Sequence, residues 1–199
     1  MLARRLHQEQ LRADLVLGIP RGGVAVADKV ALAMDLPLDV IVTRKVGAPG
    51  NPELAVGAVT SEGHALWNET LLRQLSLTPE DLSEEVREAR WDIDERISRY
   101  RAGRVGRAVE GKQVILVDDG IATGFTVKAA LSSLREAGAA ATTLAVPVAP
   151  QDTLDDLRPE VDHLVCLSSP EPFWAVSTFY SSFAQVSSRE VVNILSRHS

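Results

Sequence analysis

Short apolar runs alternate along the chain with longer segments in which apolar residues recur at helical spacing. Each apolar run is bounded by Gly, Pro or Asp, a pattern typical of strands buried on both faces of a sheet. Helical segments at 22–36 and 126–138 lie between these runs, so the pattern predicts an α/β fold with a mostly parallel central sheet of about five strands flanked by helices. The predicted strands are residues 14–19, 38–43, 114–117, 142–148 and 162–168.

A long amphipathic helix is predicted over residues 78–102, where it interrupts this alternation. Thr78 is a typical helix cap and Pro79 fits the first helical position. We favour a surface helix, and packing of its apolar stripe on a second subunit of a homo-oligomer stays open. The stripe comprises Leu82, Val86, Ala89, Ile93, Ile97 and Tyr100. The charge spacing predicts ion pairs on the solvated face between Asp92 and Arg96 and between Glu95 and Arg99.

Composition and charge narrow the class of protein. The 199 residues are 45% hydrophobic, which predicts a single folded domain over residues 1–199. With Cys166 as the only cysteine, no intrachain disulfide can form, and a cytoplasmic location is expected. The N-terminal residues are too charged for a signal peptide, and no apolar run is long enough to span a bilayer, so no membrane partner is expected. The net charge of −6, with dispersed basic residues, argues against nucleic acid as a partner.

The stretch VILVDDGIATGFT, residues 114–126, carries the strongest chemical signal. A predicted strand ends on Asp118 and Asp119, and a loop rich in Gly and Thr then leads into a helix. Backbone amides at a helix N-terminus bind anions, and Gly120 and Gly124 let the backbone approach a phosphate closely. The two carboxylates would repel a phosphate, but they can accept hydrogen bonds from sugar hydroxyls nearby. The stretch therefore predicts a site for a ribose 5-phosphate.

This stretch closely resembles the signature of the type I phosphoribosyltransferases, which bind 5-phosphoribosyl 1-pyrophosphate through two acidic residues followed by a loop of Thr and Gly. The resemblance covers most of the chain, from Leu15 to about Gln185. It implies that Asp118 and Asp119 hold the ribose 2- and 3-hydroxyls and, indirectly through the substrate, Mg²⁺. It also implies that the 5-phosphate is bound by Ala122, Thr123, Gly124, Phe125 and Thr126.

The loop GIPRGGVAVA, residues 18–27, follows the first predicted strand. Arg21 supplies a fixed positive charge, and Gly22 and Gly23 leave backbone amides free to approach an anion at a helix N-terminus. In the family that the chain resembles, the loop at this position grips the pyrophosphate, often through a cis peptide. The resemblance therefore implies that Arg21, Gly22 and Gly23 bind pyrophosphate. Taken alone, a Gly pair after a strand also fits a tight turn.

Residues 43–63 follow the second predicted strand and form a third candidate loop. Arg44 and Lys45 lie at the strand end, where the family commonly places basic residues against pyrophosphate. The following residues are rich in Gly and Pro, which predicts a lid over the site. Asn51 and Glu53 are candidates for completing the closed site. A plain β-hairpin is the alternative, and it is compatible with a lid because ELAVGAV has strand character.

A small hood or floor is predicted over about residues 168–199. The stretch SSPEPFWAVSTFYSSFAQ is unusually aromatic, and aromatic faces suit a planar heterocycle. The resemblance implies that this region receives the nitrogenous base, and Phe173 and Trp174 are the residues that we assign to it. Packing of the rings onto the core is the alternative for most of them.

The resemblance implies an enzyme that transfers the phosphoribosyl group from 5-phosphoribosyl 1-pyrophosphate to a nitrogenous acceptor, with Mg²⁺ as cofactor and pyrophosphate as product. The N-terminal segment is short and the 78–102 helix is an insertion relative to the salvage enzymes, so no particular base is assigned. The main alternative is a regulatory module that senses phosphoribosyl pyrophosphate or a nucleotide, and hydrolytic or synthase use of the site is a third option. The expected catalytic residues are Asp118, Asp119, Arg21, Arg44 and Lys45.

Overall fold

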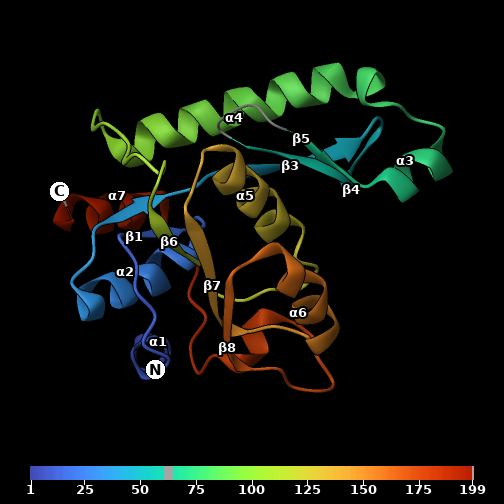
Figure 1. The fold of residues 1–199 in the computed structure, drawn as a ribbon. Coiled ribbons are helices and arrows are strands. Elements are labelled where there is room, and N and C mark those ends of the chain that lie inside the picture. Colours follow the sequence, from blue (N-terminus) through green and yellow to red (C-terminus); the bar gives the residue numbers. More distant parts are fainter. Residues whose placement is uncertain (61–64, 199) are drawn as a thin grey trace.

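The structure is a computed structural model that describes residues 1–60 and 65–198. Residues 61–63 of the predicted lid, His64, and Ser199 at the end of the predicted domain lie outside the described residues. Two sheets organise the chain (Figure 1), a five-stranded parallel sheet and a three-stranded antiparallel one. The predicted α/β fold with its parallel central sheet is confirmed.

The central sheet has the strand order β2-β1-β6-β7-β8, and all neighbouring strands are parallel. The register places Gly18 of β1 opposite both Val40 of β2 and Val117 of β6. The C-terminal ends of these three strands therefore meet at one edge. The strand bounds are β1 Leu15–Gly18, β2 Leu38–Val40, β6 Gln113–Val117, β7 Ala141–Val148 and β8 His163–Ser168.

Both faces of the central sheet are buried, which explains why its strands are apolar without alternation. On one face, Val16, Ile115 and Val117 belong to a core shared with α1 (Leu2–Gln8), α2 (Gly22–Met34) and α7 (Ser188–Arg197). On the other face, Leu17, Leu116 and Leu144 pack with α5 (Phe125–Glu136) and α6 (Gln151–Leu157). Figure 1 shows these two groups of helices on opposite sides of the sheet.

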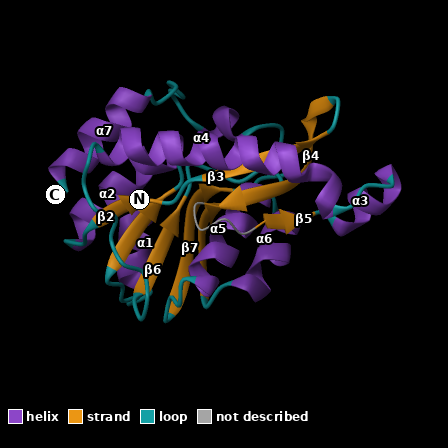
Figure 2. Cartoon of the chain, turned by 90° about the horizontal axis from the view of Figure 1, so that it is seen from above, coloured by secondary structure: helices purple, strands orange, loops and turns teal. Residues whose placement is uncertain are grey.

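The three-stranded sheet consists of β3 (Thr43–Ala48), β4 (Asn51–Thr60) and β5 (Ala65–Trp67), in that order. Within residues 43–60, the chain has the β-hairpin that the sequence left open as an alternative. Helix α4 (Ser83–Arg101) contacts this hairpin, and α5 contacts it as well. Figure 2 shows α4 lying along the hairpin and continuing toward α7. Helix α3 (Glu69–Leu75), which the sequence analysis did not predict, connects β5 to the α4 region.

The predicted helix over 78–102 is divided in the structure. It begins as a 3₁₀ helix (Pro79–Leu82) with a reciprocal cap between Thr78 and Asp81, and it continues as α4. Its apolar stripe packs on the chain itself: Leu82, Ala89, Ile93 and Tyr100 are buried, and Val86 and Ile97 are half-buried.

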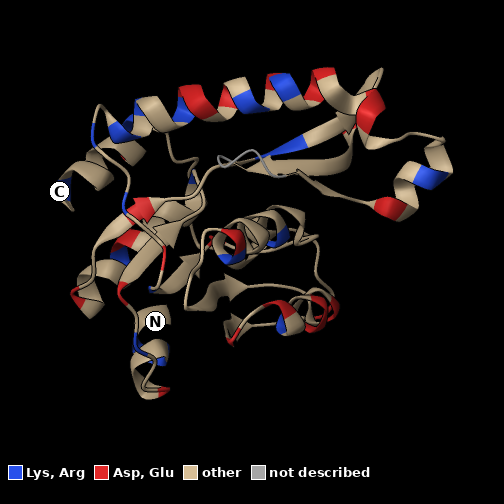
Figure 3. Cartoon of the chain, turned by 45° about the horizontal axis from the view of Figure 1, so that its top comes forward, with Lys and Arg blue, Asp and Glu red and all other residues tan. Residues whose placement is uncertain are grey.

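The charges of α4 alternate in sign along its exposed side (Figure 3). The predicted pair between Glu95 and Arg99 is present. The predicted partner of Asp92 is wrong: Asp92 pairs with Arg44 of β3, at 3.1 Å, instead of with Arg96. The reason is that the hairpin lies against α4 and brings a strand cation next to the helix carboxylate.

The C-terminal end of α4 is tied to the edge strand of the central sheet. Buried Asp39 of β2 accepts a hydrogen bond from Arg101 at 3.3 Å and another from the backbone N–H of Arg107 at 2.8 Å. These contacts give a buried carboxylate the partners that it needs. They fix the C-terminal end of α4 to β2.

After β8, the chain contains a short 3₁₀ helix (Val176–Phe179) and then α7, which packs with α2 and α4. Another 3₁₀ helix (Arg158–Glu160) precedes β8. Residues 169–187 are therefore the part of the predicted hood that precedes α7. Within residues 1–60 and 65–198, no helix has the length and apolar character needed to cross a bilayer.

Candidate functional site

The chain leaves the neighbouring strands β1 and β6 toward opposite edges of the central sheet. From β1 the chain passes through α2 to β2, and from β6 it passes through α5 to β7 on the other side of the sheet. In open α/β sheets, ligands generally bind beyond the carboxyl ends of the two strands at such a switch in topology. The pairing of Gly18 with Val117 places the loop after β1 beside the loop after β6.

Gly22 and Gly23 are packed directly against the two aspartates of the neighbouring loop. A Cβ at Gly22 would lie 1.7 Å from Oδ2 of Asp119. A Cβ at Gly23 would lie 2.8 Å from the carbonyl oxygen of Val117 and 2.9 Å from the Cα of Asp118. The absence of a side chain at these two positions therefore allows the close approach of the two loops. Their contact brings two of the three loops proposed from the sequence into one site.

The diacid pair, Asp118 and Asp119, lies in an electrostatically unfavourable place. Burial, and then the charge of Asp119, raise the pKa of Asp118 well above its usual value, and burial raises the pKa of Asp119. The Asp118 carboxylate accepts one hydrogen bond, from the backbone N–H of Asp119 at 2.9 Å. Within the described part of the chain, no Lys, Arg or His forms an ion pair with either carboxylate. Hydroxyl donors or a cation would relieve this repulsion.

The loop after the aspartates offers open backbone amides at a helix start. Helix α5 begins at Phe125, and its cap Gly124 has a φ of 72°, a left-handed conformation that favours glycine. Among described residues, no hydrogen bond engages the backbone N–H groups of residues 122–126. Ala122 and Thr123 are exposed, and Phe125 and Thr126 are half-buried. Open amides of this kind, together with the positive end of the helix dipole, are suited to binding one phosphate group.

Neighbouring elements hold this loop in place. The backbone N–H of Ile121 donates to the carbonyl oxygen of Val148 at 2.9 Å. The hydroxyl of Thr153, on α6, donates to the carbonyl oxygen of Ala122 at 2.9 Å. The loop is therefore anchored through the carbonyl group of Ala122 and through the amide of Ile121, and neither contact uses the open amides of residues 122–126.

The loop after β1 presents a second helix start. The Pro20–Arg21 peptide is cis, the feature that the family resemblance associates with this loop. Arg21 is the cap residue of α2 and its side chain is exposed. Because α2 starts at Gly22, its N-terminal amides also face the carboxyl edge of the sheet. The carboxyl edge beyond β1 and β6 thus combines two helix starts, whose amides suit an anion, with the two carboxylates of the diacid pair.

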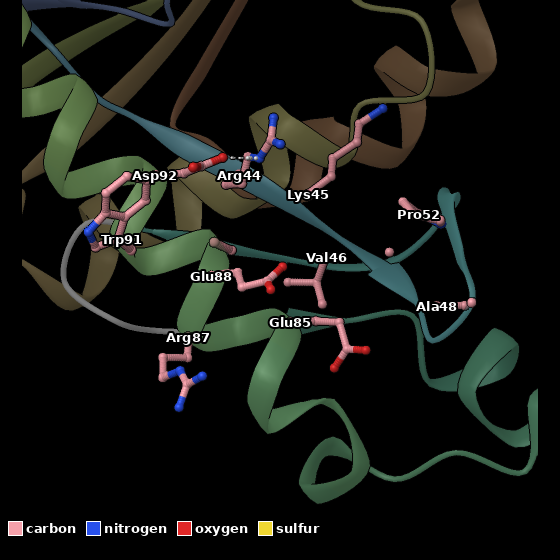
Figure 4. A pocket seen from close by; sticks show the side chains of 13 residues that line it. Arg44, Lys45, Val46, Ala48, Pro52, Glu85, Arg87, Glu88, Trp91 and Asp92 are labelled. Atoms are coloured by element: carbon pink, nitrogen blue, oxygen red, sulfur yellow. Dashed lines mark ion pairs between the residues drawn. The ribbon is translucent and has the colours of Figure 1, made fainter.

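The basic residues of β3 are placed differently from each other. Arg44 pairs with Asp92 of α4, whereas Lys45 extends away from α4 (Figure 4). A groove of about 700 Å³ lies between α4 and the hairpin, and Trp91 lines it. Asn51 and Glu53 are exposed at the start of β4, in the part of the hairpin that extends away from the central sheet (Figure 1). The structure does not bring Asn51 and Glu53 together with the diacid pair.

The aromatic segment after β8 reaches the site through residues that sequence reasoning missed. The hydroxyl of Tyr180 donates a hydrogen bond to the carbonyl oxygen of Asp119 at 2.5 Å. Phe173 is half-buried and stacks on Phe179 with ring centroids 5.2 Å apart, while Trp174 is 81% exposed. Aromatic content alone marked the segment in the sequence, and nothing in the pattern singled out Tyr180. The described residues contain no cluster of three or more His, Cys, Asp or Glu side chains that could hold a metal unaided.

Comparisons with known proteins agree with this geometry. Residues 1–181 match the family model described as "Phosphoribosyl transferase domain". A curated relative from Mycobacterium tuberculosis strain H37Rv, named "Putative phosphoribosyl transferase Rv0571c", is 42% identical over 196 residues. The alignment covers 98% of this chain and 44% of the relative, so the chain spans less than half of that protein's length.

Solved structures also resemble the chain. The crystal structure of TT1426 from Thermus thermophilus is 41% identical, with a TM-score of 0.86, and the alignment covers 100% of this chain and 94% of that one. A hypothetical protein from Neisseria gonorrhoeae, solved with bound ppGpp, shares the fold with a TM-score of 0.52 at 12% identity, covering 100% of this chain and 89% of that one. With the family model matching residues 1–181, the chain belongs to the phosphoribosyl transferase domain family.

Proposed function

We propose that the chain transfers the phosphoribosyl group of 5-phosphoribosyl 1-pyrophosphate to a nitrogenous acceptor and releases pyrophosphate. The observation that carries this proposal is the contact of Gly22 and Gly23 with the diacid pair at the switch point, next to the open amides of residues 122–126. This edge of the central sheet has separate places for two anions, together with hydroxyl-binding carboxylates. A ribose that carries a 5-phosphate and a 1-pyrophosphate has the groups that match them.

The proposed binding assigns one role to each part of the site. The amides of residues 122–126 bind the 5-phosphate, and the carboxylates of Asp118 and Asp119 accept hydrogen bonds from the ribose hydroxyls. Arg21 and the amides of Gly22 and Gly23 bind the pyrophosphate, with Lys45 and Arg44 reaching it from the hairpin. Hydrogen bonds from the hydroxyls would stabilise the ionised carboxylates, whose pKa values are raised by burial and, for Asp118, also by the charge of Asp119.

Mg²⁺ fits the donor set of this site. Carboxylate oxygens are ligands that Mg²⁺ prefers, and it commonly binds through one or two of them together with substrate phosphates and water. The diacid pair supplies two carboxylates, and the described residues add no third acidic or His ligand beside them. Bound together with 5-phosphoribosyl 1-pyrophosphate, called the donor below, Mg²⁺ would neutralise negative charge on the pyrophosphate group.

In this reaction the protein positions the two substrates and stabilises the charge that develops on them. A lone pair on the acceptor nitrogen forms a bond to carbon 1 of the ribose, the bond from carbon 1 to the pyrophosphate oxygen breaks with its electron pair leaving on that oxygen, and the nitrogen loses a proton. Positive charge develops on the sugar near Asp118 and Asp119, while negative charge develops on the pyrophosphate near Arg21. Exclusion of water protects the reactive sugar from hydrolysis.

The acceptor is proposed to be a nucleobase-like heterocycle bound by residues 169–187. Phe173 and Trp174 offer flat faces, and the exposed ring of Trp174 is free to stack on a ligand. A screen of bases and amines with donor and Mg²⁺, with pyrophosphate release as the readout, tests the transfer. Release with at least one acceptor supports the enzyme. Donor binding without pyrophosphate release across a broad panel would contradict the transferase and favour the regulatory module that senses the donor.

We expect donor affinity to weaken as the pH falls. The raised pKa values mean that protons bind to the diacid pair in a pH range where ordinary aspartates are already ionised. Mg²⁺ and ribose hydroxyls bind the ionised carboxylates, so binding of the donor releases protons. For each proton released, the affinity falls by up to about tenfold when the pH is lowered by one unit. Calorimetry in two buffers of different ionisation enthalpy measures the protons released.

Asp118→Asn is the control for this pH dependence, because it removes one of the two titrating groups. The phosphates of the donor also titrate, near pH 6, and their contribution is common to both proteins. The variant should therefore release fewer protons than the wild-type chain at the same pH. Equal proton release from the two proteins would contradict the assignment of the titration to the diacid pair.

We expect Asp92→Asn to strengthen donor binding modestly. If Arg44 binds pyrophosphate, the donor must compete with Asp92 for it, and both side chains of this pair are partly exposed, at 46% and 32%. Exposed ion pairs contribute up to about 1 kcal/mol, so the dissociation constant for donor with Mg²⁺ should fall by up to about fivefold in calorimetry. Glu95→Gln, which breaks the Glu95–Arg99 pair on the same helix, is the matched control and should leave the affinity unchanged. Unchanged or weaker binding by Asp92→Asn would remove Arg44 from the site.

A further inference from the structure

The segment between β8 and α7 touches the diacid loop at two adjacent positions. The Tyr180 hydroxyl donates to the carbonyl oxygen of Asp119 at 2.5 Å. One residue further along the loop, Gly120 lies against Val176, because a Cβ at Gly120 would lie 2.5 Å from Cγ1 of Val176. The two contacts involve consecutive residues of the loop and both ends of one short stretch, residues 176–180. They therefore join two segments that are far apart in the sequence.

The hydrogen bond acts on the backbone of the diacid pair. The carbonyl group of Asp119 belongs to the planar peptide that links Asp119 to Gly120, so the hydrogen bond ties Tyr180 to the backbone of the diacid loop. Burial and the charges of Asp119 and Asp118 raise the pKa of Tyr180 to about 12. The Tyr180 phenol therefore stays neutral, and remains a hydrogen-bond donor, over the pH range in which proteins are usually studied. Its ring lies against Phe183, with centroids 5.1 Å apart.

The same segment carries the rings proposed for the acceptor. Phe179, next to Tyr180 in the chain, stacks on Phe173. A change in the position of the Asp119 carbonyl group is therefore transmitted through one hydrogen bond to the stretch on which the acceptor would rest. A network of this kind transmits a ligand's effect when both ends bias the same contact.

We propose that Tyr180 is a positioning residue that couples the donor site to the acceptor segment, through its hydrogen bond to the Asp119 carbonyl oxygen. The inference rests on the proposed function, because it takes the diacid pair as the ribose site. Donor binding at Asp119 strengthens the contact with Tyr180 and orders residues 173–186.

Hydrogen exchange with Mg²⁺ and ribose 5-phosphate tests the coupling without any acceptor. Ribose 5-phosphate carries the hydroxyls and the 5-phosphate that the diacid loop is proposed to hold. In the wild-type chain, we expect this ligand to slow amide exchange at least about threefold in residues 118–126 and also in 173–186. In Tyr180→Phe, which removes only the hydroxyl, the slowing should persist in 118–126 and disappear in 173–186.

Tyr100→Phe is the matched control, since it removes the hydroxyl of the only other tyrosine in the chain, on α4. It should behave like the wild-type chain in both segments. Ligand protection of 173–186 that survives in Tyr180→Phe would overturn the coupling, and so would protection of 118–126 without protection of 173–186 in the wild-type chain. Absence of protection in 118–126 of the wild-type chain would overturn the ribose site itself and the proposed function with it.

Discussion

Replacing both aspartates, in Asp118→Asn with Asp119→Asn, should abolish Mg²⁺-dependent donor binding and at the same time stabilise the fold. Each carboxylate is expected to accept hydrogen bonds from ribose hydroxyls, and hydrogen bonds to charged groups contribute about 1.5–3 kcal/mol. Loss of two such interactions corresponds to a drop in affinity of about 100-fold to 10,000-fold. Calorimetric titration with donor and Mg²⁺ measures this loss.

The gain in stability follows from the direction of the pKa shifts. Burial raises the pKa values of both aspartates in the folded chain, and the charge of Asp119 raises that of Asp118 further, so the folded state binds protons more tightly than the unfolded state. Wild-type stability therefore falls as the pH rises from about 4, the unfolded value, through the raised folded values, and the penalty is complete above them. The amide pair lacks this penalty. On the order of 1 kcal/mol of relief would raise the Tm by about 2–4 °C.

Thermal unfolding at several pH values separates this effect from an unspecific one. The difference in Tm between the double variant and the wild-type chain should be small near pH 4 and should grow as the pH rises. Asp39→Asn provides the contrast, because Asp39 is a buried carboxylate with the Arg101 side chain and the Arg107 N–H as partners. Its loss should lower the Tm without changing donor affinity. A double variant that is less stable than wild type at pH 8 would contradict the electrostatic account of the site.

The two glycines should respond differently to alanine. At Gly22, the new Cβ would meet the end of the Asp119 side chain, which can rotate away. We expect Gly22→Ala to keep its Tm and to lose about tenfold to 100-fold in donor affinity, because a displaced carboxylate forfeits one charged hydrogen bond. At Gly23, the new Cβ would meet the backbone of Val117 and Asp118, which cannot rotate away. Overpacking of this kind costs about 1–3 kcal/mol, so Gly23→Ala should lower the Tm by about 2–10 °C.

A double-mutant cycle checks the cause of the Gly22 effect. In an Asp119→Ala background no carboxylate remains for the new methyl group to displace. Gly22→Ala should then cost no further donor affinity, since the two changes act on one contact. If the losses of the two single variants simply add in the double variant, Gly22 acts on the donor by some other route.

The central sheet and the part of the candidate site that follows β6 were predictable from the sequence, because both depend on local patterns. Strands buried on two faces are apolar throughout, so their positions could be predicted, as the agreement of 114–117 with β6 illustrates. Asp118 and Asp119 follow β6 directly, and a residue at a strand end has its position fixed by the strand. The helix start after Gly124 is likewise encoded locally, by the glycine and by the apolar face of α5.

The features that the sequence did not predict depend on contacts between distant segments. The Arg44–Asp92 pair exists because the hairpin lies against α4, and helix spacing alone had favoured Arg96 as the partner. Tyr180 was one of several aromatic residues in its segment, and only the fold places its hydroxyl at the carbonyl group of Asp119. The packing of Gly22 on Asp119 is similar: the sequence marked both residues as candidates, but the register of β1 with β6 creates their contact.

A crystal structure of the chain with Mg²⁺ and 5-phosphoribosyl 1-pyrophosphate would show directly where the donor binds. We expect the ribose hydroxyls within hydrogen-bonding distance of the Asp118 and Asp119 carboxylates, the 5-phosphate on the backbone amides of residues 122–126, and the pyrophosphate at residues 21–23. A donor bound elsewhere, for example in the groove between α4 and the hairpin, with the diacid pair making no contact to it, would contradict the account.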